Sequence, residues 1–599
     1  MRALGSFLLF ALLAPGLARA AGPDLGPLER GAVEVALAAR GLSIDSVPEG
    51  KTVGAIHVLN LDVFQPSDGG LFVWFNHFHR TSREHHIRRE SLLHPGMAYD
   101  PLLVEETLRN LRNRAPYQAN DPPVTGIVAM VPIQAPTPGT VDLLMVTRDV
   151  WSLRFNTDYN YQPGYLINLS TSLSENNLFG WRKQAAFAYQ LNEGDMWLGP
   201  TYFDPNVMGS RLRLTAAFYE IWARKIGEIA AGPHEGSAAR LRVEYPFYAL
   251  ANRWGGFVDG SYQNSVARSL SGPSLRQFNP TTVSCVGPSE PNFDGVDPRA
   301  DCAYRMRLGS LTSGFTRSFP RPWLIQRVTV GNEFGLVRPD FLPEFPVELR
   351  QSFRDKYFRT SERTSSLYVQ YDVFTPRYQT YRNLDTFDLA EDMRLGPWVT
   401  VKAGRASTLL GSERDFFTVS AEAHANLGLG GGFQSLGASW AARKYSEGWL
   451  DQLVKGNLYA ATPMLGGAVR VVASGAVGTM ADNVHRGVVT VGALEGLRGY
   501  PVNVFYGYDY YLAHLELRSV GLPVKSLRLG GLIFADAGHA ANTWQDLQFY
   551  GDAGAGMRLL IPQLNVEVLR CDWAFPFRAY GGTNAGWPGR LSCGFHQAF

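Results

Sequence analysis

The chain has 599 residues, of which 62 are glycine and 12% are aromatic, while only 18% are charged. The 56 basic and 54 acidic residues nearly cancel, which argues against a nucleic-acid-binding protein, because such proteins usually carry a basic excess. A hydrophobic content of 45% argues against disorder, and no apolar run reaches about 18 residues, so no membrane-spanning helix is predicted.

Residues 1–20 are predicted to be a secretory signal peptide. Arg2 supplies the positive charge at the start, and the apolar run 4–13 is too short to cross a bilayer. Ala18 and Ala20 then place small residues at the two positions on which cleavage depends. A short buried N-terminal helix is the alternative interpretation. Export would bring the chain into a compartment where disulfides persist.

Residues 50–148 are predicted to form a small α/β domain, which follows a helical extension at 21–49. Alternating and β-branched residues indicate its strands, and Pro101 behind the capping residue Asp100 indicates the start of its second helix. The predicted order is β-α-α-β-β, with strand 53–64, helices at 81–90 and from Asp100 onward, and strands 124–133 and 140–147.

Residues 149–599 are predicted to form a transmembrane antiparallel β-barrel, which makes the whole protein mainly β. The clearest strand is 508–520, where apolar Leu515 and Leu517 flank polar Glu516. Such alternation places one face against lipid and the other against a polar lumen. Periodicity marks about 20 segments, of which we expect about 16 to be barrel strands and the others loop hairpins or halves of long strands. A soluble β-protein is the alternative.

The four cysteines fall into two local pairs, and none has the C-x-x-C spacing of a zinc or redox site. Cys285 and Cys302 bracket a stretch rich in Pro, Gly, Asn and Asp that has no strand pattern. We predict that they form a disulfide, which would contribute roughly 3 kcal/mol in the chain-entropy model. Cys571 and Cys593 lie on candidate neighbouring strands. They could form a second disulfide or remain free thiols that pack as small apolar side chains.

The sequence carries no recognisable catalytic motif. A G-x-S-x-G elbow, a G-x-x-x-x-G-K-[ST] loop and an H-E-x-x-H helix are all absent. We therefore predict no enzyme activity, no cofactor and no metal. His77, His79, His85 and His86 lie close together and are a candidate metal site, but a solvent-facing helix and its preceding loop is the favoured interpretation.

Several motifs resemble those of one superfamily of bacterial proteins. The small domain is similar to a POTRA (polypeptide-transport-associated) domain at 81–90, Pro95-Gly96, Tyr99-Asp100 and 141–151. In the barrel, Leu497, Arg498, Gly499 and Tyr500 resemble the arginine-glycine-aromatic motif of a long sixth loop, and Phe534, Asp536 and Gly538 resemble the strand motif that faces it. Segments 175–180 and 570–574 also match. The chain thus resembles the POTRA-plus-barrel surface-antigen superfamily, which includes the BamA and TamA barrel-assembly proteins and the two-partner-secretion transporters.

The resemblance implies a location in the bacterial outer membrane, with the POTRA domain in the periplasm. It further implies that the protein inserts or translocates client polypeptides. An unfolded client would add as an extra strand to the edge of the POTRA sheet. The barrel would open at the seam between its first and last strands or conduct the client through its pore. Outer-membrane lipid would surround the barrel, and periplasmic chaperones or lipoproteins are candidate further partners.

Two departures from the superfamily favour a specialised relative over the central assembly protein. A single POTRA domain is visible, and Gln597 stands where the first of two C-terminal aromatic residues is usual, so only Phe599 remains. The alternatives are a passive pore, a surface antigen or adhesin, and a dedicated two-partner-secretion transporter. The arginine-glycine-aromatic loop favours translocation over a pore, because a pore has no need of one.

Arg498 is the residue whose environment is predicted in most detail. If the sixth loop folds back into the lumen, Arg498 leaves bulk water and needs a carboxylate partner. By strand parity Asp536 and Glu516 face the lumen, so we expect Arg498 to pair with Asp536 first and Glu516 second. These three residues are interpreted as a structural ion network and not as a catalytic acid pair with a base. An exposed arginine at a loop tip is the alternative.

Overall fold

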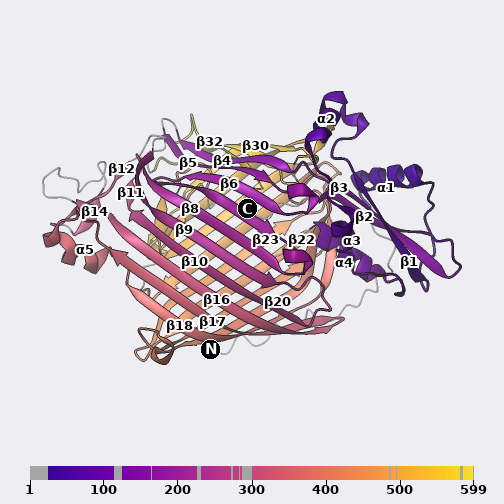
Figure 1. Ribbon diagram of the computed structural model, residues 1–599. Coiled ribbons are helices and arrows are strands. Elements are labelled where there is room, and N and C mark those ends of the chain that lie inside the picture. Colours follow the sequence, from indigo (N-terminus) through magenta and orange to yellow (C-terminus); the bar gives the residue numbers. More distant parts are fainter. Residues whose placement is uncertain are drawn as a thin grey trace.

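The computed structural model describes residues 25–112, 125–162, 165–225, 231–271, 274–281, 283–286, 300–484, 488–493, 496–502, 504–564, 566–580, 584–595 and 597. They form an N-terminal α/β domain attached to one end of a closed β-barrel (Figure 1). We call this end of the barrel the domain end and the opposite one the far end. The predicted signal peptide lies outside the described residues, and none of the described helices is long and apolar enough to cross a membrane.

The N-terminal domain contains the three strands and two helices of the predicted β-α-α-β-β order, and a further helix precedes them within the predicted helical extension. Its elements are α1 Pro27–Arg40, β1 Thr52–Leu61, η1 Pro66–Asp68, α2 Gly70–Phe75, η2 Asn76–Phe78, α3 Glu84–Arg88, α4 Pro101–Arg112, β2 Thr125–Gln134 and β3 Thr140–Asp149. The sheet has the order β1-β3-β2, in which β1 runs parallel and β2 antiparallel to β3. The short elements η1, α2 and η2 were not predicted and form an insertion between β1 and α3.

Alternation along β3 builds two cores, one on each face of the sheet. Leu143 and Met145 pack with α3 and α4, while Leu144 and Val146 pack with α1. Helix α4 starts where the sequence predicts, because the Asp100 carboxylate accepts a hydrogen bond from the backbone N–H of Leu102 at 2.9 Å. The sheet is therefore covered by helices on both faces, and only its edges remain for pairing.

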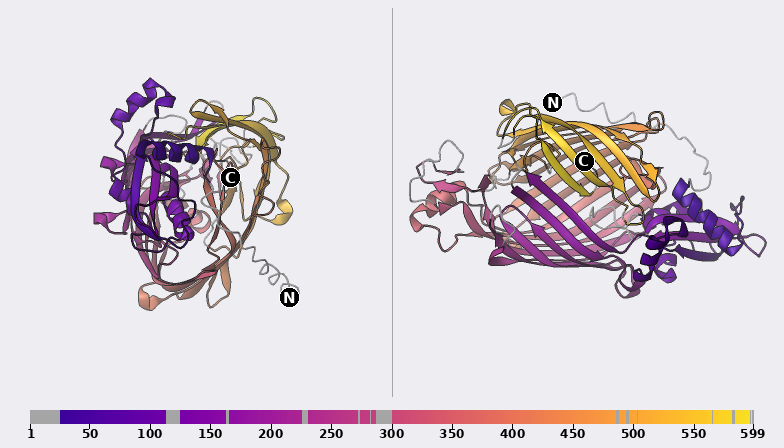
Figure 2. Two further views of the ribbon diagram at one scale, coloured as in Figure 1. Left: turned by 90° about the vertical axis from the view of Figure 1, so that its right-hand side faces the viewer. Right: turned by 90° about the horizontal axis from the view of Figure 1, so that it is seen from above.

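The barrel is confirmed as a closed antiparallel structure. Its strands are β4 Leu153–Gln162, β5 Tyr165–Glu175, β6 Gln184–Leu191, β7 Asp195–Asp204, β8 Arg213–Arg224, β9 Ala231–Tyr245, β10 Trp254–Arg268, β16 Ala303–Arg321, β17 Leu324–Asp340, β18 Glu362–Phe374, β19 Arg377–Tyr381, β20 Glu391–Ala406, β21 Phe416–Leu427, β22 Phe433–Lys444, β23 Trp449–Ala461, β24 Val469–Ala481, β27 Asp509–Ser519, β28 Leu522–Val524, β29 Leu527–Ala541, β30 Gly551–Leu560, β31 Leu569–Pro576 and β32 Arg590–Phe595. They tilt strongly against the barrel axis (Figure 2), and β32 pairs with β4 to close the ring.

The expected number of about 16 barrel strands is wrong. Segments β18 and β19 both pair with β20, and β27 and β28 both pair with β29, so each of these two pairs fills a single place in the wall. Within the described residues, 20 places around the ring result. Periodicity found the segments but gives no means of telling a wall strand from a loop hairpin, because both alternate.

Side chains alternate between the two surfaces of the barrel wall. On β29, Ile533 is 59% exposed and points outward, whereas Phe534 and Asp536 are buried on the inside. The same outward apolar positions recur on most strands, including Phe155, Leu173, Phe187, Leu241, Val258, Phe315, Val330, Leu367, Leu436, Leu458, Leu515 and Met557. The outer surface is therefore an apolar belt, and the polar and charged residues gather inside.

The far end carries a small module stapled by a disulfide. It contains the short strands β11 Leu270–Ser271, β12 Ser274–Leu275, β13 Gln277–Asn279, β14 Ser284–Val286 and β15 Ala300–Asp301, the turn η5 Val347–Leu349 and helix α5 Arg350–Lys356. Cys285 and Cys302, the pair that the sequence predicts, are joined there. Phe278, Phe345 and Phe353 form its core. The remaining elements are η3 Leu178–Gly180, η4 Val207–Gly209, η6 Thr408–Leu410, β25 Val489–Val491, β26 Phe505–Gly507 and η7 Trp544–Asp546.

Candidate functional site: an arginine held inside the barrel

The connection between β24 and β27 enters the barrel instead of lying over it. We call its described residues, 482–484, 488–493, 496–502 and 504–508, the inward loop; its strands β25 and β26 pair with each other. Val491, Leu497, Tyr500 and Phe505 are buried in one cluster with wall residues such as Tyr550. Of the 20 strand places, 15 precede this loop and 5 follow it, so it is the eighth far-end connection counted from β4 among the described strands, and not the sixth.

Arg498, at the tip of the inward loop, is almost fully buried against three carboxylates. Its Nε and Nη2 donate to the two oxygens of Asp536 at 2.7 and 2.8 Å, which is the two-pronged geometry that guanidinium favours. Its Nη1 donates to Glu516 at 2.6 Å and lies 3.3 Å from Asp572. The guanidinium carbon stands 3.5 Å from the ring centre of Phe534. Arg498 therefore contacts both carboxylates that strand parity predicts, Asp536 and Glu516. It also contacts a third, Asp572, which was not predicted.

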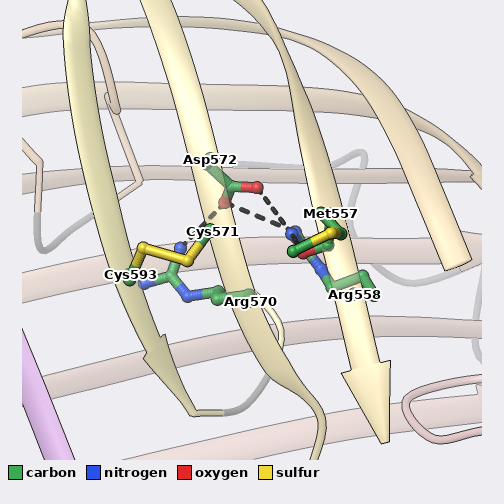
Figure 3. The surroundings of a disulfide bond; sticks show 6 residues. All are labelled: Met557, Arg558, Arg570, Cys571, Asp572 and Cys593. Carbon is green, nitrogen blue, oxygen red and sulfur yellow. Dashed lines mark hydrogen bonds and ion pairs between the residues drawn. A yellow bond between two sulfur atoms is a disulfide. The ribbon is translucent and has the colours of Figure 1, made fainter. Parts of the chain in front are cut away.

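The carboxylates around Arg498 each have further basic partners, on their own strand or on a neighbouring one. His514 Nδ1 lies 3.1 Å from Asp536, Arg518 Nε donates to Glu516 at 2.6 Å, and Arg558 and Arg570 donate to Asp572 at 2.6 and 3.1 Å. Figure 3 shows the last two contacts on β30 and β31. The site is thus a nearly balanced ion network across four consecutive wall strands. Such a network holds the inward loop in place.

The residues that flank Arg498 fix the loop tip through the backbone. The N–H of Gly499 donates to Asp552 at 2.8 Å, and a β-carbon on Gly499 would stand only 2.7 Å from the Asp552 β-carbon, so no other residue fits. The Tyr500 hydroxyl donates to the Arg578 carbonyl at 2.9 Å. Gly538 does not contact Arg498 but leaves room for Leu512 and for the inward loop at Val491. Leu497 is buried.

The seam between the last and first strands, β32 and β4, closes the ring next to this network. Among the described residues, Ser592 pairs with Asn160 and Cys593 with Tyr159 across it. Cys571 and Cys593, left open by the sequence, stand opposite each other on β31 and β32 and form a disulfide (Figure 3). Strand β32 is therefore linked covalently to β31, whereas it meets β4 through strand pairing alone.

A second segment enters the barrel from the domain end. The connection of β19 to β20, residues 382–390, reaches from its own side of the wall to the strands that surround Arg498; we call it the crossing turn. The carbonyls of Asn383, Leu384 and Asp385 accept hydrogen bonds from Arg470 on β24, Arg518 on β27 and Gln597 near the C-terminus, at 2.9, 3.1 and 3.0 Å. Because Arg518 also binds Glu516, the crossing turn and the inward loop belong to one connected network.

The crossing turn is held in shape from within and also contacts the N-terminal domain. The carboxylate of Glu391 accepts hydrogen bonds from three successive backbone N–H groups of the turn. Phe387 fills the space that Gly521 and Gly530 leave free. Arg382 pairs with Glu29 of α1 at 2.8 Å, so the domain is seated on the turn. Sequence reasoning missed this segment, because nothing in its composition distinguishes it from an ordinary loop.

The candidate histidine cluster is dispersed. His79 contacts Ser152, and the rings of His85 and His86 lie 4.0 Å apart at a tilt of 39°. Burial above all, and the charges of His85 and Arg182 after it, lower the pKa of His86 from 6.5 to about 4. Within the described part of the chain, no three histidine, cysteine or carboxylate side chains are placed to hold a metal.

Comparison with known proteins adds little. No protein-family model and no curated protein matches the sequence. Among solved structures, BamA from Haemophilus ducreyi lacking POTRA domains 1–3 has 12% identity and a TM-score of 0.34 over 90% of this chain and 85% of that one. CdiB from Escherichia coli has 11% identity and a TM-score of 0.42 over 92% and 77%. The FrpB iron transporter from Neisseria meningitidis has 9% identity and a TM-score of 0.37 over 78% and 87%.

Proposed function

We propose that the protein resides in the bacterial outer membrane and inserts or translocates client polypeptides there. The apolar belt on the outside of the barrel and the charged interior suit a wall that separates lipid from a polar lumen. The N-terminal domain would be a POTRA domain in the periplasm, which makes the domain end the periplasmic end. The observation that carries the proposal is the closure of the ring between its last and first strands, β32 and β4, because these two neighbours have no connecting loop and could separate by giving up strand pairing alone.

The N-terminal domain supplies a surface for an unfolded client. Strand β1 is an edge strand, and the carbonyl of Val58 points away from β3, since it accepts a hydrogen bond from Arg40 at 3.0 Å. By alternation the backbone groups of Ile56 and Asn60 face the same edge. An extended chain that adds there would gain backbone hydrogen bonds with little demand on its sequence. The client would then pass from this edge to the seam.

A passive pore is the alternative that the interior disfavours. The inward loop enters from the far end and the crossing turn from the domain end, so two segments lie inside the barrel. A pore that serves only for diffusion has no reason to fill its lumen twice.

A metal staple across the seam tests the proposal. Asn160→His with Ser592→His places two histidines at directly opposed positions of β4 and β32, where zinc would hold the strands together. Zinc is expected to lower the amount of newly assembled outer-membrane proteins in cells, and EDTA to restore it. The matched control is Asn156→His with Ser172→His on β4 and β5, which already pair along their length. Unchanged assembly with the seam staple formed would rule the proposal out.

A further inference from the structure

The insertion between β1 and α3 presents aromatic side chains that nothing in the described structure covers. We call residues 62–79 the rim segment; it contains η1, α2 and η2. Trp74 and Phe78 are 52% and 64% exposed, and Phe72 is exposed on the same short helix. Between Gly69 and Phe78 the sequence has no Lys, Arg, Asp or Glu. A soluble domain gains nothing from displaying such a cluster, so these side chains are expected to meet an apolar partner.

Hydrogen bonds and ring packing fix the conformation of the rim segment, so its exposed rings do not belong to a loosely held loop. The side chain of Asn76 exchanges two hydrogen bonds with the backbone of Phe64, at 3.1 and 2.8 Å, which closes the segment on itself. Phe64 packs against Phe72, with ring centres 5.5 Å apart. The exposed aromatic face is therefore held in one orientation.

Two sets of contacts fasten the rim segment to the barrel on either side of β32. Phe64 and Phe75 pack on Trp151, which precedes β4, with ring centres 5.9 and 5.8 Å apart. On the other side the Asp68 carboxylate binds Ser526 before β29 and Gln563 after β30. The segment consequently lies at the domain end of the barrel, beside the seam.

The barrel also exposes apolar side chains at the end where the rim segment lies. Outward residues at the same end include Leu153 on β4 and Leu522 and Val524 on β28, all exposed. Figure 1 shows α2 at the domain end, beyond the edge of the barrel wall near β4 and β30, and the end-on view in Figure 2 also places this helix outside the barrel outline. A bilayer that surrounds the barrel would therefore reach the aromatic rings.

We propose that the rim segment inserts its aromatic side chains into the boundary between headgroups and acyl chains of the membrane leaflet at the domain end. The inference rests on the membrane location in the proposed function, but not on the handling of clients. Tryptophan and phenylalanine favour this boundary, and the absence of charged residues from 69–78 removes the main cost of entering it. Because the segment is attached to Trp151, insertion would hold the start of β4 at a fixed depth in the membrane beside the seam.

Site-specific labelling of the full chain in lipid vesicles tests this inference. All four native cysteines are in disulfides, so an introduced cysteine is the single free thiol. An environment-sensitive fluorophore on Phe78→Cys is expected to emit at shorter wavelength in vesicles, and lipids with a nitroxide near the headgroup are expected to quench about half of its emission or more. The matched control is Val35→Cys on α1, which is 52% exposed on another part of the domain and should not be quenched.

A third label separates failure of this inference from failure of the proposed location. Ile533→Cys lies on the outward face of β29 and reports whether the barrel is surrounded by lipid. Quenching at both Ile533→Cys and Phe78→Cys supports the inference. Quenching at Ile533→Cys alone overturns it and leaves the barrel in the membrane, in which case the aromatic face would serve a protein partner. No quenching at either position overturns the membrane location as well.

Discussion

Arg498 illustrates how much a single charged residue contributes when its partners are buried with it. Arg498→Ala would leave Asp536 and Glu516 without their shared cation inside the barrel. We expect the free energy of unfolding of the variant to be lower by about 3–5 kcal/mol, because the carboxylates that lose their partner stay desolvated. Arg498→Lys should recover only part of this, since an ammonium group cannot reproduce the two-pronged contact with Asp536. Urea unfolding of the barrel in micelles, followed by heat-modifiable gel migration, measures both effects.

An exposed arginine on the same barrel provides the control for this prediction. Arg307 pairs with Asp340 at 3.6 Å, and both side chains are about half exposed or more. Arg307→Ala should therefore change the free energy of unfolding by about 0–1 kcal/mol. Equal effects of Arg498→Ala and Arg307→Ala would mean that the buried network does not stabilise the barrel.

The crossing turn acts as one structural element across the domain end of the lumen. Phe387→Ala removes the side chain that occupies the space beside Gly521 and Gly530. Loss of this packing should loosen the turn, since removal of a buried phenylalanine typically costs about 3–5 kcal/mol. We expect higher conductance of the variant in planar bilayers while the barrel itself stays folded.

Leu409→Ala is a suitable control for the crossing turn, because Leu409 is 95% exposed in a far-end loop. Its conductance should equal that of the unaltered protein. If Phe387→Ala conducts no better than Leu409→Ala, the crossing turn does not restrict the lumen.

The elements also differ in how far the sequence predicts them. The segment 508–520 became β27, Asp509–Ser519, because its alternation is regular and its polar residues have a charged interior to face. Helix α4 begins at Pro101 as the capping residue indicates. Helix α2 was missed, because six residues without polar alternation carry no helical period. An apolar segment without periodicity still indicates burial of its side chains. For α2 we propose that this burial is in lipid.

At the scale of the whole molecule, the disulfide of Cys571 and Cys593 gives β32 a covalent link on one side, and the seam to β4 on its other side has none. Cys571→Ser with Cys593→Ser would release β32 from its covalent link to β31 and leave it held by strand pairing on both sides. We expect the temperature at which the barrel loses its folded gel migration to fall. A loop of 22 residues corresponds to roughly 3 kcal/mol in the chain-entropy model.

The second disulfide serves as the control because it has a similar loop of 17 residues but lies in the far-end module. Cys285→Ser with Cys302→Ser should loosen that module and leave the migration temperature of the barrel unchanged. A drop of equal size in both double variants would show that the position of the disulfide beside the seam has no special effect.

The sequence by itself determined the two-part organisation, the alternating wall and the carboxylates that Arg498 meets, because side-chain parity and capping are local properties of the chain. Only the tertiary structure decided the 20 places in the ring, since strand pairing is a relation between distant segments. The same holds for the crossing turn, for Asp572 as a third partner of Arg498 and for the bond between Cys571 and Cys593. These features depend on which strands become neighbours and on how the ring closes, and no local pattern encodes either.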